Sequence, residues 1–230
     1  MPALFITATG TDSGKTFVSA GLLRALRGRG RRVMALKPVV TGFDEANYAA
    51  SDPALLLEAC GQKSDLAAIA KISPWRFPAP LSPDMAARLQ GKAIDIAALT
   101  RFCSTAIIEA DDALLIEGIG GLMVPLDGKT TICDLIGALN IPMVLVAGTY
   151  LGSLSHTLSA LEVVQKRGLA IAALVVDETE ASPVPLEAVC ESLGHFCNSP
   201  IIALHRGASA HGGAFERLAE LLPTPPASMA

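Results

Sequence analysis

The stretch ALFITATGTDSGKTF (residues 3–17) decides the fold. A short apolar run leads into a polar turn of small residues, and an amphipathic helical pattern follows at once. The turn ends in Gly14-Lys15-Thr16 as a phosphate-binding P-loop does, although Thr9 stands where the usual motif has its first glycine. Unpaired N–H groups at such a helix start attract phosphate, Lys15 would reach the β- and γ-phosphates, and the Thr16 hydroxyl would ligate Mg²⁺. The alternative is an ordinary tight turn before a helix.

Apolar runs of strand length alternate with longer helical patterns along the rest of the chain. We predict core strands at residues 3–7, 32–36, 113–117, 141–147, 170–176 and 200–204. We predict helices near residues 15–28, 53–60, 84–90, 95–109, 131–138, 153–167, 184–194 and 213–221. The order predicts a doubly wound α/β fold of the P-loop NTPase type, in which helices flank a mostly parallel sheet.

Length and composition agree with one α/β domain over residues 1–230, with a frayed tail at 222–230. Hydrophobic residues make up 51% and aromatics 4%, so Ala, Leu, Ile and Val must build the core. The segment 38–83 is rich in proline and shows no clear strand, so we expect a long excursion beside the ligand crevice.

Charge and targeting patterns exclude several functional classes. The net charge is −4, and the one basic cluster (Arg24, Arg27, Arg29, Arg31 and Arg32) is too short for a nucleic-acid surface. The five scattered cysteines are typical of reduced thiols. The first residues lack a basic signal region, and no apolar run approaches the ~20 residues of a membrane span. We expect a soluble, cytoplasmic protein that binds neither membrane nor nucleic acid.

Charged residues end two of the predicted strands. Lys37 follows the strand at 32–36, where a second cation beside the P-loop would assist a substrate that gains negative charge; a surface lysine at a strand end is the alternative. Glu117 ends the strand at 113–117, where P-loop proteins hold Mg²⁺, and the glycines after it would let the chain approach a ligand. Asp52 is either a second such carboxylate or a helix cap.

A second anion site is indicated after the strand at 141–147. Residues 151–155 begin a helix whose free N–H groups would bind a carboxylate or phosphate, although serine N-capping explains the same residues. His156 in the first turn is interpreted as packing or facing solvent rather than acting in catalysis.

Several motifs together resemble those of the dethiobiotin synthetase family. The matching pieces are ATGTDSGKT (8–16), KPVVTG (37–42), SD (51–52), PLSPD (80–84), IEGIGG (116–121) and LGSLSHT (151–157). Their order and spacing agree from residue 3 to about 177, and the family's loop also carries threonine at the place of Thr9. By this resemblance the loop is a true P-loop variant.

The resemblance implies an ATP-dependent ligase of biotin biosynthesis that forms C–N bonds. Its substrates would be 7,8-diaminononanoate and CO₂ or bicarbonate: one amine takes up CO₂ as a carbamate, ATP phosphorylates the carbamate, and the second amine closes the ureido ring. The enzyme would be a homodimer that uses Mg²⁺, and the distant carboxylate of the substrate would lie on residues 151–155 of the other subunit.

The resemblance also assigns roles to residues. Catalysis falls to Lys37, Lys15 and Thr11, and nucleotide binding to Asp12, Ser13, Gly14, Lys15, Thr16, Phe17 and Asp177. The metal ligands are Thr16, Asp52 and Glu117. Substrate contacts fall to Thr11, Lys37, Thr41, Gly118, Leu151, Gly152, Ser153, Leu154 and Ser155.

Three positions depart from the family pattern, and a later proline-rich turn of the family appears only as PIIALHR (200–206). Asp84 replaces a histidine, Ser155 replaces an asparagine, and Asp177 replaces the asparagine that binds adenine. An ionised aspartate accepts from the adenine amino group but cannot donate to N7, so we expect a loosened or shifted nucleotide preference. The rival interpretations are another P-loop small-molecule kinase or ligase, and a nucleotide-switched partition ATPase.

Overall fold

The computed structural model of the chain describes residues 3–207 and 213–221. Its strands are β1 (Ala3–Ala8), β2 (Val33–Leu36), β3 (Val39–Thr41), β4 (Trp75–Phe77), β5 (Ala113–Glu117), β6 (Met143–Gly148), β7 (Ile171–Asp177) and β8 (Ile201–Leu204). Its helices are α1 (Lys15–Gly28), the 3₁₀ helix η1 (Glu45–Ala50), α2 (Asp52–Ala59), α3 (Leu66–Ile72), α4 (Pro83–Leu89), α5 (Ile96–Glu109), α6 (Ile132–Leu139), α7 (Ser153–Lys166), α8 (Leu186–Gly194) and α9 (Gly213–Glu220). Every predicted helix and strand is present, with its ends within two residues of their predicted places. The tail predicted to fray, 222–230, lies outside the described residues.

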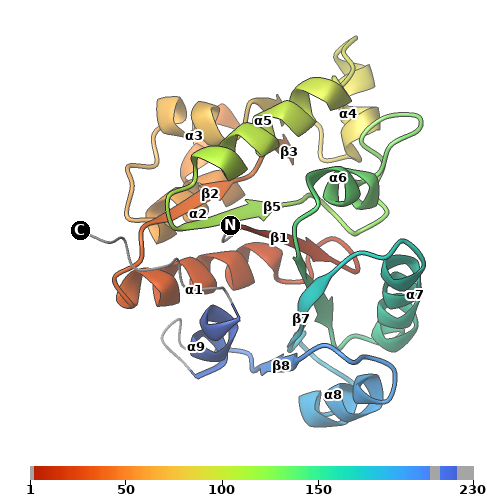
Figure 1. The fold of residues 1–230 in the computed structure, drawn as a ribbon. Helices are drawn as coiled ribbons and strands as arrows, with labels where there is room; N and C mark the ends of the chain where they lie inside the picture. Colours follow the sequence, from red (N-terminus) through yellow and green to blue (C-terminus); the bar gives the residue numbers. More distant parts are fainter. Residues whose placement is uncertain (1–2, 208–212, 222–230) are drawn as a thin grey trace.

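A six-stranded parallel sheet forms the centre of the fold, in the order β2-β5-β1-β6-β7-β8 (Figure 1). β1 pairs with β5 on one side, where Ile6 lies opposite Glu117, and with β6 on the other, where Ala8 lies opposite Val146. Because the strands are parallel, their carboxyl ends share one edge, and the P-loop leaves the sheet there. The strand order changes direction around β1, which is where open α/β sheets bind ligands.

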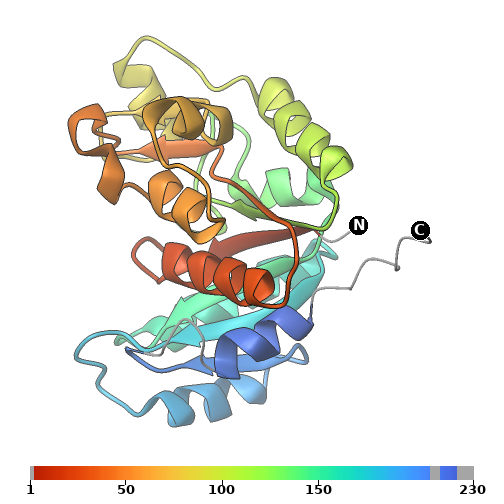
Figure 2. The same cartoon turned by 90° about the vertical axis from the view of Figure 1, so that its left-hand side faces the viewer.

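The two faces of the sheet pack against different helices, because successive strand residues point to opposite sides. Leu4 and Ile6 of β1 lie in a core with α1, α2 and α9. Ala3 and Phe5 lie in the core formed with α4, α5, α6, α7 and α8. Figure 2 shows α1, in red, side by side with α9, in dark blue, on the first of these faces. The predicted doubly wound fold is confirmed.

The proline-rich segment 38–83 is more regular than its sequence predicted. β3 and β4 pair in parallel as a separate two-stranded sheet, with Val39 opposite Trp75, and η1 and α3 lie in the same segment. The prediction that this segment has no strand is therefore wrong. Strands of three residues are too short to give an alternating pattern, so periodicity could not reveal them.

The predicted arginine cluster is engaged by groups of the same chain. Its ion pairs are Arg29 with Glu216 and Glu220, Arg31 with Asp112, and Arg32 with Asp111, and Arg27 donates to the Ala59 carbonyl. The five cysteines, all in the described part of the chain, are free thiols. No helix within the described ranges combines the length and apolar character needed to cross a bilayer.

Candidate active site

The turn between β1 and α1 has the shape of a phosphate-binding loop. α1 begins at Lys15, and Gly14 before it adopts a left-handed conformation with φ 82°. The Ser13 hydroxyl donates to the Gly10 carbonyl at 3.1 Å and tightens the loop. The loop residues line a cleft of about 480 Å³, so the unpaired N–H groups at the start of α1 lie beside open space. This geometry favours the P-loop over an ordinary tight turn.

Two glycines let neighbouring segments approach the P-loop closely. A Cβ at Gly14 would lie 2.0 Å from Oδ2 of Asp177, so the last residue of β7 rests on the loop. A Cβ at Gly121 would lie 3.0 Å from the carbonyl oxygen of Thr9. We expected the glycines after Glu117 to let the chain approach a ligand, but Gly121 serves the packing of its segment against the P-loop.

Lys15 lies folded back on the loop. Its Nζ donates to the Gly10 carbonyl at 3.1 Å. Burial, together with the positive charge of Lys37, lowers the pKa of Lys15 to about 8. A bound phosphate would compensate both effects, because it supplies negative charge and further acceptors to this ammonium.

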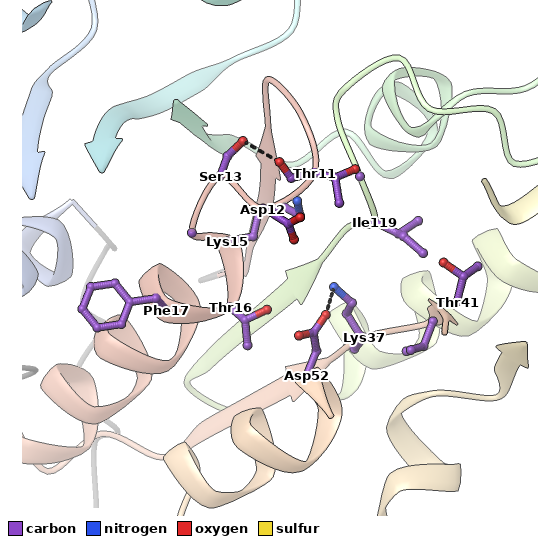
Figure 3. A pocket seen from close by; sticks show the side chains of 13 residues that line it. Thr11, Asp12, Ser13, Lys15, Thr16, Phe17, Lys37, Thr41, Asp52 and Ile119 are labelled. Carbon is purple, nitrogen blue, oxygen red and sulfur yellow. Dashed lines mark hydrogen bonds and ion pairs between the residues drawn. The ribbon is translucent and has the colours of Figure 1, made fainter. Parts of the chain in front are cut away.

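A buried ion cluster joins the ends of β2 and β5, two neighbouring strands of the sheet. The Lys37 Nζ donates to Glu117 Oε1 at 2.6 Å and to the Gly118 carbonyl at 2.9 Å. It also lies 3.0 Å from Asp52 Oδ2, the ion pair drawn as a dashed line in Figure 3. The Thr16 hydroxyl donates to the same Glu117 Oε1 at 2.8 Å. Four residues from distant parts of the sequence therefore meet within hydrogen-bond distance.

Burial and charge act against each other in this cluster. The side chains of Lys37 and Glu117 are 2% and 1% exposed, whereas that of Asp52 is 44% exposed. Burial alone would lower the pKa of Lys37, but Glu117 and Asp52 hold it above its usual value. Burial would also raise the pKa of Asp52, and Lys37 holds it below its usual value. The cluster therefore favours a lysine ammonium between carboxylates.

The structure decides two alternatives that the sequence left open. Lys37 is buried and paired, so it is not a surface lysine at a strand end. The cap of α2 is Ser51, and Asp52 is the first residue of the helix with its carboxylate on Lys37. Asp52 therefore belongs to the ion cluster rather than to a helix cap.

The donor set at this place fits a hard divalent cation. The Thr16 hydroxyl and the carboxylates of Asp52 and Glu117 supply oxygen ligands of the kind that Mg²⁺ prefers. Glu117 Oε2 is buried and lacks a hydrogen-bond partner among the described residues, so one acceptor is left over. These oxygens lie beside the P-loop, where phosphate oxygens would complete the coordination.

The cleft brings together most of the predicted site residues. It is lined by Thr11, Asp12, Ser13, Gly14, Lys15, Thr16, Phe17, Lys37, Val40, Thr41, Asp52, Ile119 and Gly120. Figure 3 shows the lysines, Thr16 and Asp52 around the middle of this cleft, with Thr41 and Ile119 on one side and Phe17 on the other. Glu117 and Gly118 are not part of the lining but contact it, Glu117 through Lys37 and Thr16 and Gly118 through Lys37. Val40 and Ile119 also line the cleft and were given no role, although they lie within the motifs KPVVTG and IEGIGG, whereas Gly120 is one of the glycines expected to approach a ligand.

Asp177 lies in a second hollow beside the P-loop. This space of about 420 Å³ is lined by Phe17, Asp177, Glu178, Arg206 and Gly207. Burial raises the pKa of Asp177 to about 6, and the charge of Arg206 only partly opposes that rise. Sequence reasoning missed Glu178 and Arg206, although both stand just after the carboxyl ends of β7 and β8, where ligand residues gather.

The predicted second anion site begins α7, apart from the lining of the cleft. The cap of α7 is Gly152, with φ 93° and no side chain, so serine N-capping is not the arrangement found. Leu151 is 88% exposed. His156 is exposed and its ring Nδ1 shares a hydrogen bond of 2.8 Å with the Tyr150 hydroxyl, as expected for a residue without a catalytic partner.

Asp84, which departs from the family pattern, is held within its own helix start. Its carboxylate accepts from the Ser82 hydroxyl at 2.6 Å and pairs with Arg88 at 3.0 Å. The side chain is 14% exposed and does not line the cleft. Its charge is therefore compensated locally.

Comparisons with known proteins agree with this geometry. A family model described as an AAA domain matches residues 2–204. The ATP-dependent dethiobiotin synthetase BioD of Acidiphilium cryptum is 50% identical over 194 residues, which cover 84% of this chain and 87% of that protein. The enzyme of the same name from Methylobacterium nodulans is 42% identical over 212 residues, which cover 90% and 94%.

Solved structures support the fold alone, because their sequences are distant. The cell division ATPase MinD of Pyrococcus furiosus aligns with a TM-score of 0.53 at 18% identity, over 96% of this chain and 98% of that one. Cobyrinic acid a,c-diamide synthase of Mycobacterium smegmatis, with bound ADP and magnesium, aligns with a TM-score of 0.53 at 15% identity, over 97% and 99%. The close relatives and the P-loop site together show that this chain belongs to the family of ATP-dependent dethiobiotin synthetases.

Proposed function

We propose that this chain is an ATP-dependent ligase that converts 7,8-diaminononanoate and CO₂ into dethiobiotin, with release of ADP and phosphate. The observation that carries the proposal is the convergence of two buried lysines, a P-loop and two carboxylates on one cleft. The reaction requires this combination, because a carbamate and a transferring phosphoryl group bring two anions together. Family membership supports the same reaction.

The P-loop provides the nucleotide site of the proposal. The backbone from Asp12 to Phe17 surrounds the phosphates, and Lys15 leaves the Gly10 carbonyl to contact them. Thr16, Asp52 and Glu117 would hold Mg²⁺, which would neutralise negative charge on the phosphates. The hollow at Asp177 lies next to Phe17 and is the proposed place of the base.

The opposite side of the cleft provides the substrate site. The Lys37 ammonium would stabilise the carbamate oxygens as they attack the γ-phosphoryl group, since this charge develops only during the reaction. Thr11 and Thr41 line the cleft together with Lys37 and offer hydroxyls to the reacting end of the diamine. Gly118 contributes its backbone. The second amine then displaces phosphate from the mixed anhydride and closes the ring.

We assign the distant carboxylate of the substrate to a second copy of the chain. Residues Leu151 to Ser155 lie at the start of α7, where the Ser153 N–H already donates to the Tyr150 carbonyl, and none of them lines the cleft of its own chain. In a homodimer, the start of α7 would reach the cleft of the partner. The exposed Leu151 supports this arrangement, because an interface would bury it.

The experiment follows phosphate release from Mg·ATP with omission of each substrate. Release should require both bicarbonate and the diamine. Lys37→Met should lose turnover while Lys166→Met, at an exposed lysine of α7, should retain it. A simple kinase would transfer the phosphoryl group to its substrate and release no phosphate, and a partition ATPase would release phosphate without the diamine, so either pattern would refute the proposal.

A further inference from the structure

The ammonium of Lys37 occupies one oxygen of each carboxylate that a metal ion would use. It lies 2.6 Å from Glu117 Oε1 and 3.0 Å from Asp52 Oδ2. Both carboxylates belong to the proposed Mg²⁺ ligand set, and the third member, Thr16, donates to the same Glu117 oxygen. Two donors, the Lys37 ammonium and the Thr16 hydroxyl, therefore converge on Glu117 Oε1, and a second cation cannot share that oxygen with the ammonium.

Because Glu117 is buried, water cannot compensate its charge if Lys37 leaves. Glu117 is 1% exposed, so its negative charge requires a positive partner at all times. Lys37 provides that partner in the arrangement described here. When a metal ion binds the same oxygens, Lys37 must leave them, because the ion brings the compensating charge itself.

We propose that Lys37 is an exchangeable counter-ion: it fills the cation site until Mg²⁺ arrives with the nucleotide, and the exchange then releases its ammonium into the cleft. The inference rests on the proposed function, because the released ammonium meets the carbamate there. Lys37 already lines the cleft together with Thr41, so a change of side-chain torsions moves its charge from the carboxylates toward the substrate side. Metal binding thereby positions the lysine for the reaction.

Exchange predicts that wild-type protein without nucleotide binds a divalent cation poorly. Binding of Mn²⁺ alone can be measured by the loss of its free-ion electron paramagnetic resonance signal. Lys37→Met empties the carboxylates of their ammonium, so this variant should bind Mn²⁺ at least about tenfold more tightly than wild type, a difference of about 1.4 kcal/mol. If Lys37→Met does not fold, Lys37→Gln, which keeps a hydrogen-bond donor for Glu117, is measured in its place.

Two further variants separate exchange from general electrostatics. Lys15→Met removes the same charge from the same cleft, but its ammonium contacts the Gly10 carbonyl rather than the carboxylates, so its gain should be much smaller. The double variant Lys37→Met/Glu117→Gln should lose the gain in Mn²⁺ affinity that Lys37→Met shows. Equal gains in the two single lysine variants, or a gain that survives Glu117→Gln, would overturn the proposal. Because Mn²⁺ binding requires no turnover, this result is independent of whether the chain makes dethiobiotin.

Discussion

Breaking the buried ion pair between Lys37 and Glu117 on one side should cost more stability than breaking an exposed pair. In Lys37→Met, the Glu117 carboxylate keeps one donor, the Thr16 hydroxyl, but loses its 2.6 Å ammonium partner. Removing one partner of a buried pair costs about 3–5 kcal/mol. We expect about 3 kcal/mol here, because Thr16 still donates to Glu117 and Asp52, the other partner of Lys37, is half-exposed to water. Glu117→Gln should cost about 2 kcal/mol, because Lys37 keeps Asp52 and the Gly118 carbonyl.

A double-mutant cycle tests this reasoning. The double variant buries no unpaired charge at the site, so its loss should fall about 2 kcal/mol below the sum of the single losses. Urea unfolding at pH 7.5 without metal measures each free energy of unfolding. The exposed helical pair of Lys166 and Glu162 is the matched control, with a coupling below about 0.5 kcal/mol. Additive losses at Lys37 and Glu117 would refute the idea that they depend on each other.

Three further predictions follow from single contacts. Gly14→Ala should destabilise the protein by at least about 2 kcal/mol more than Gly91→Ala in thermal unfolding. Both glycines have positive φ, but of the two only Gly14 would bring its new Cβ against a side chain, that of Asp177. Equal losses would contradict this packing. Burial raises the pKa of Asp177 from 3.8 to about 6, so its charge is unfavourable in the fold. Asp177→Asn should therefore raise the free energy of unfolding above pH 6, and this gain should vanish as the pH falls below 3.8; a gain independent of pH would contradict the reasoning. The same variant should prefer ATP over GTP more strongly in competition. Hydrogen bonding by Thr131 lowers the pKa of Asp134 from 3.8 to about 2, so the stability from its cap is present above pH 4 and is lost toward pH 2. Asp134→Asn should flatten the plot of unfolding free energy against pH between these values, and an unchanged plot would contradict this role.

Much of the fold and site could be predicted because both depend on short-range patterns. The apolar runs that became β1 and β5 are buried on both sides, so continuous hydrophobicity indicated them. Lys15 and Lys37 follow strands and Glu117 ends one, and parallel strands bring their carboxyl ends to one edge. Their meeting on one cleft was therefore predictable from chain order.

The remainder depends on tertiary contacts that leave no local pattern. Nothing near Lys37 in the sequence indicates that its ammonium contacts Glu117 and Asp52 together, since that requires the pairing of β2 with β5 and the place of α2. The short strands β3 and β4 are defined by their pairing with each other, which no local pattern of the sequence indicates. Arg206 joins the Asp177 hollow through the pairing of β7 with β8.

The most direct test of the central claim is mass detection of the product formed from ¹³C-bicarbonate, Mg·ATP and 7,8-diaminononanoate. We expect dethiobiotin that carries one ¹³C atom in its ureido carbonyl, formed with one phosphate released per molecule. Phosphate release without labelled dethiobiotin would contradict the account and leave only the nucleotide site standing.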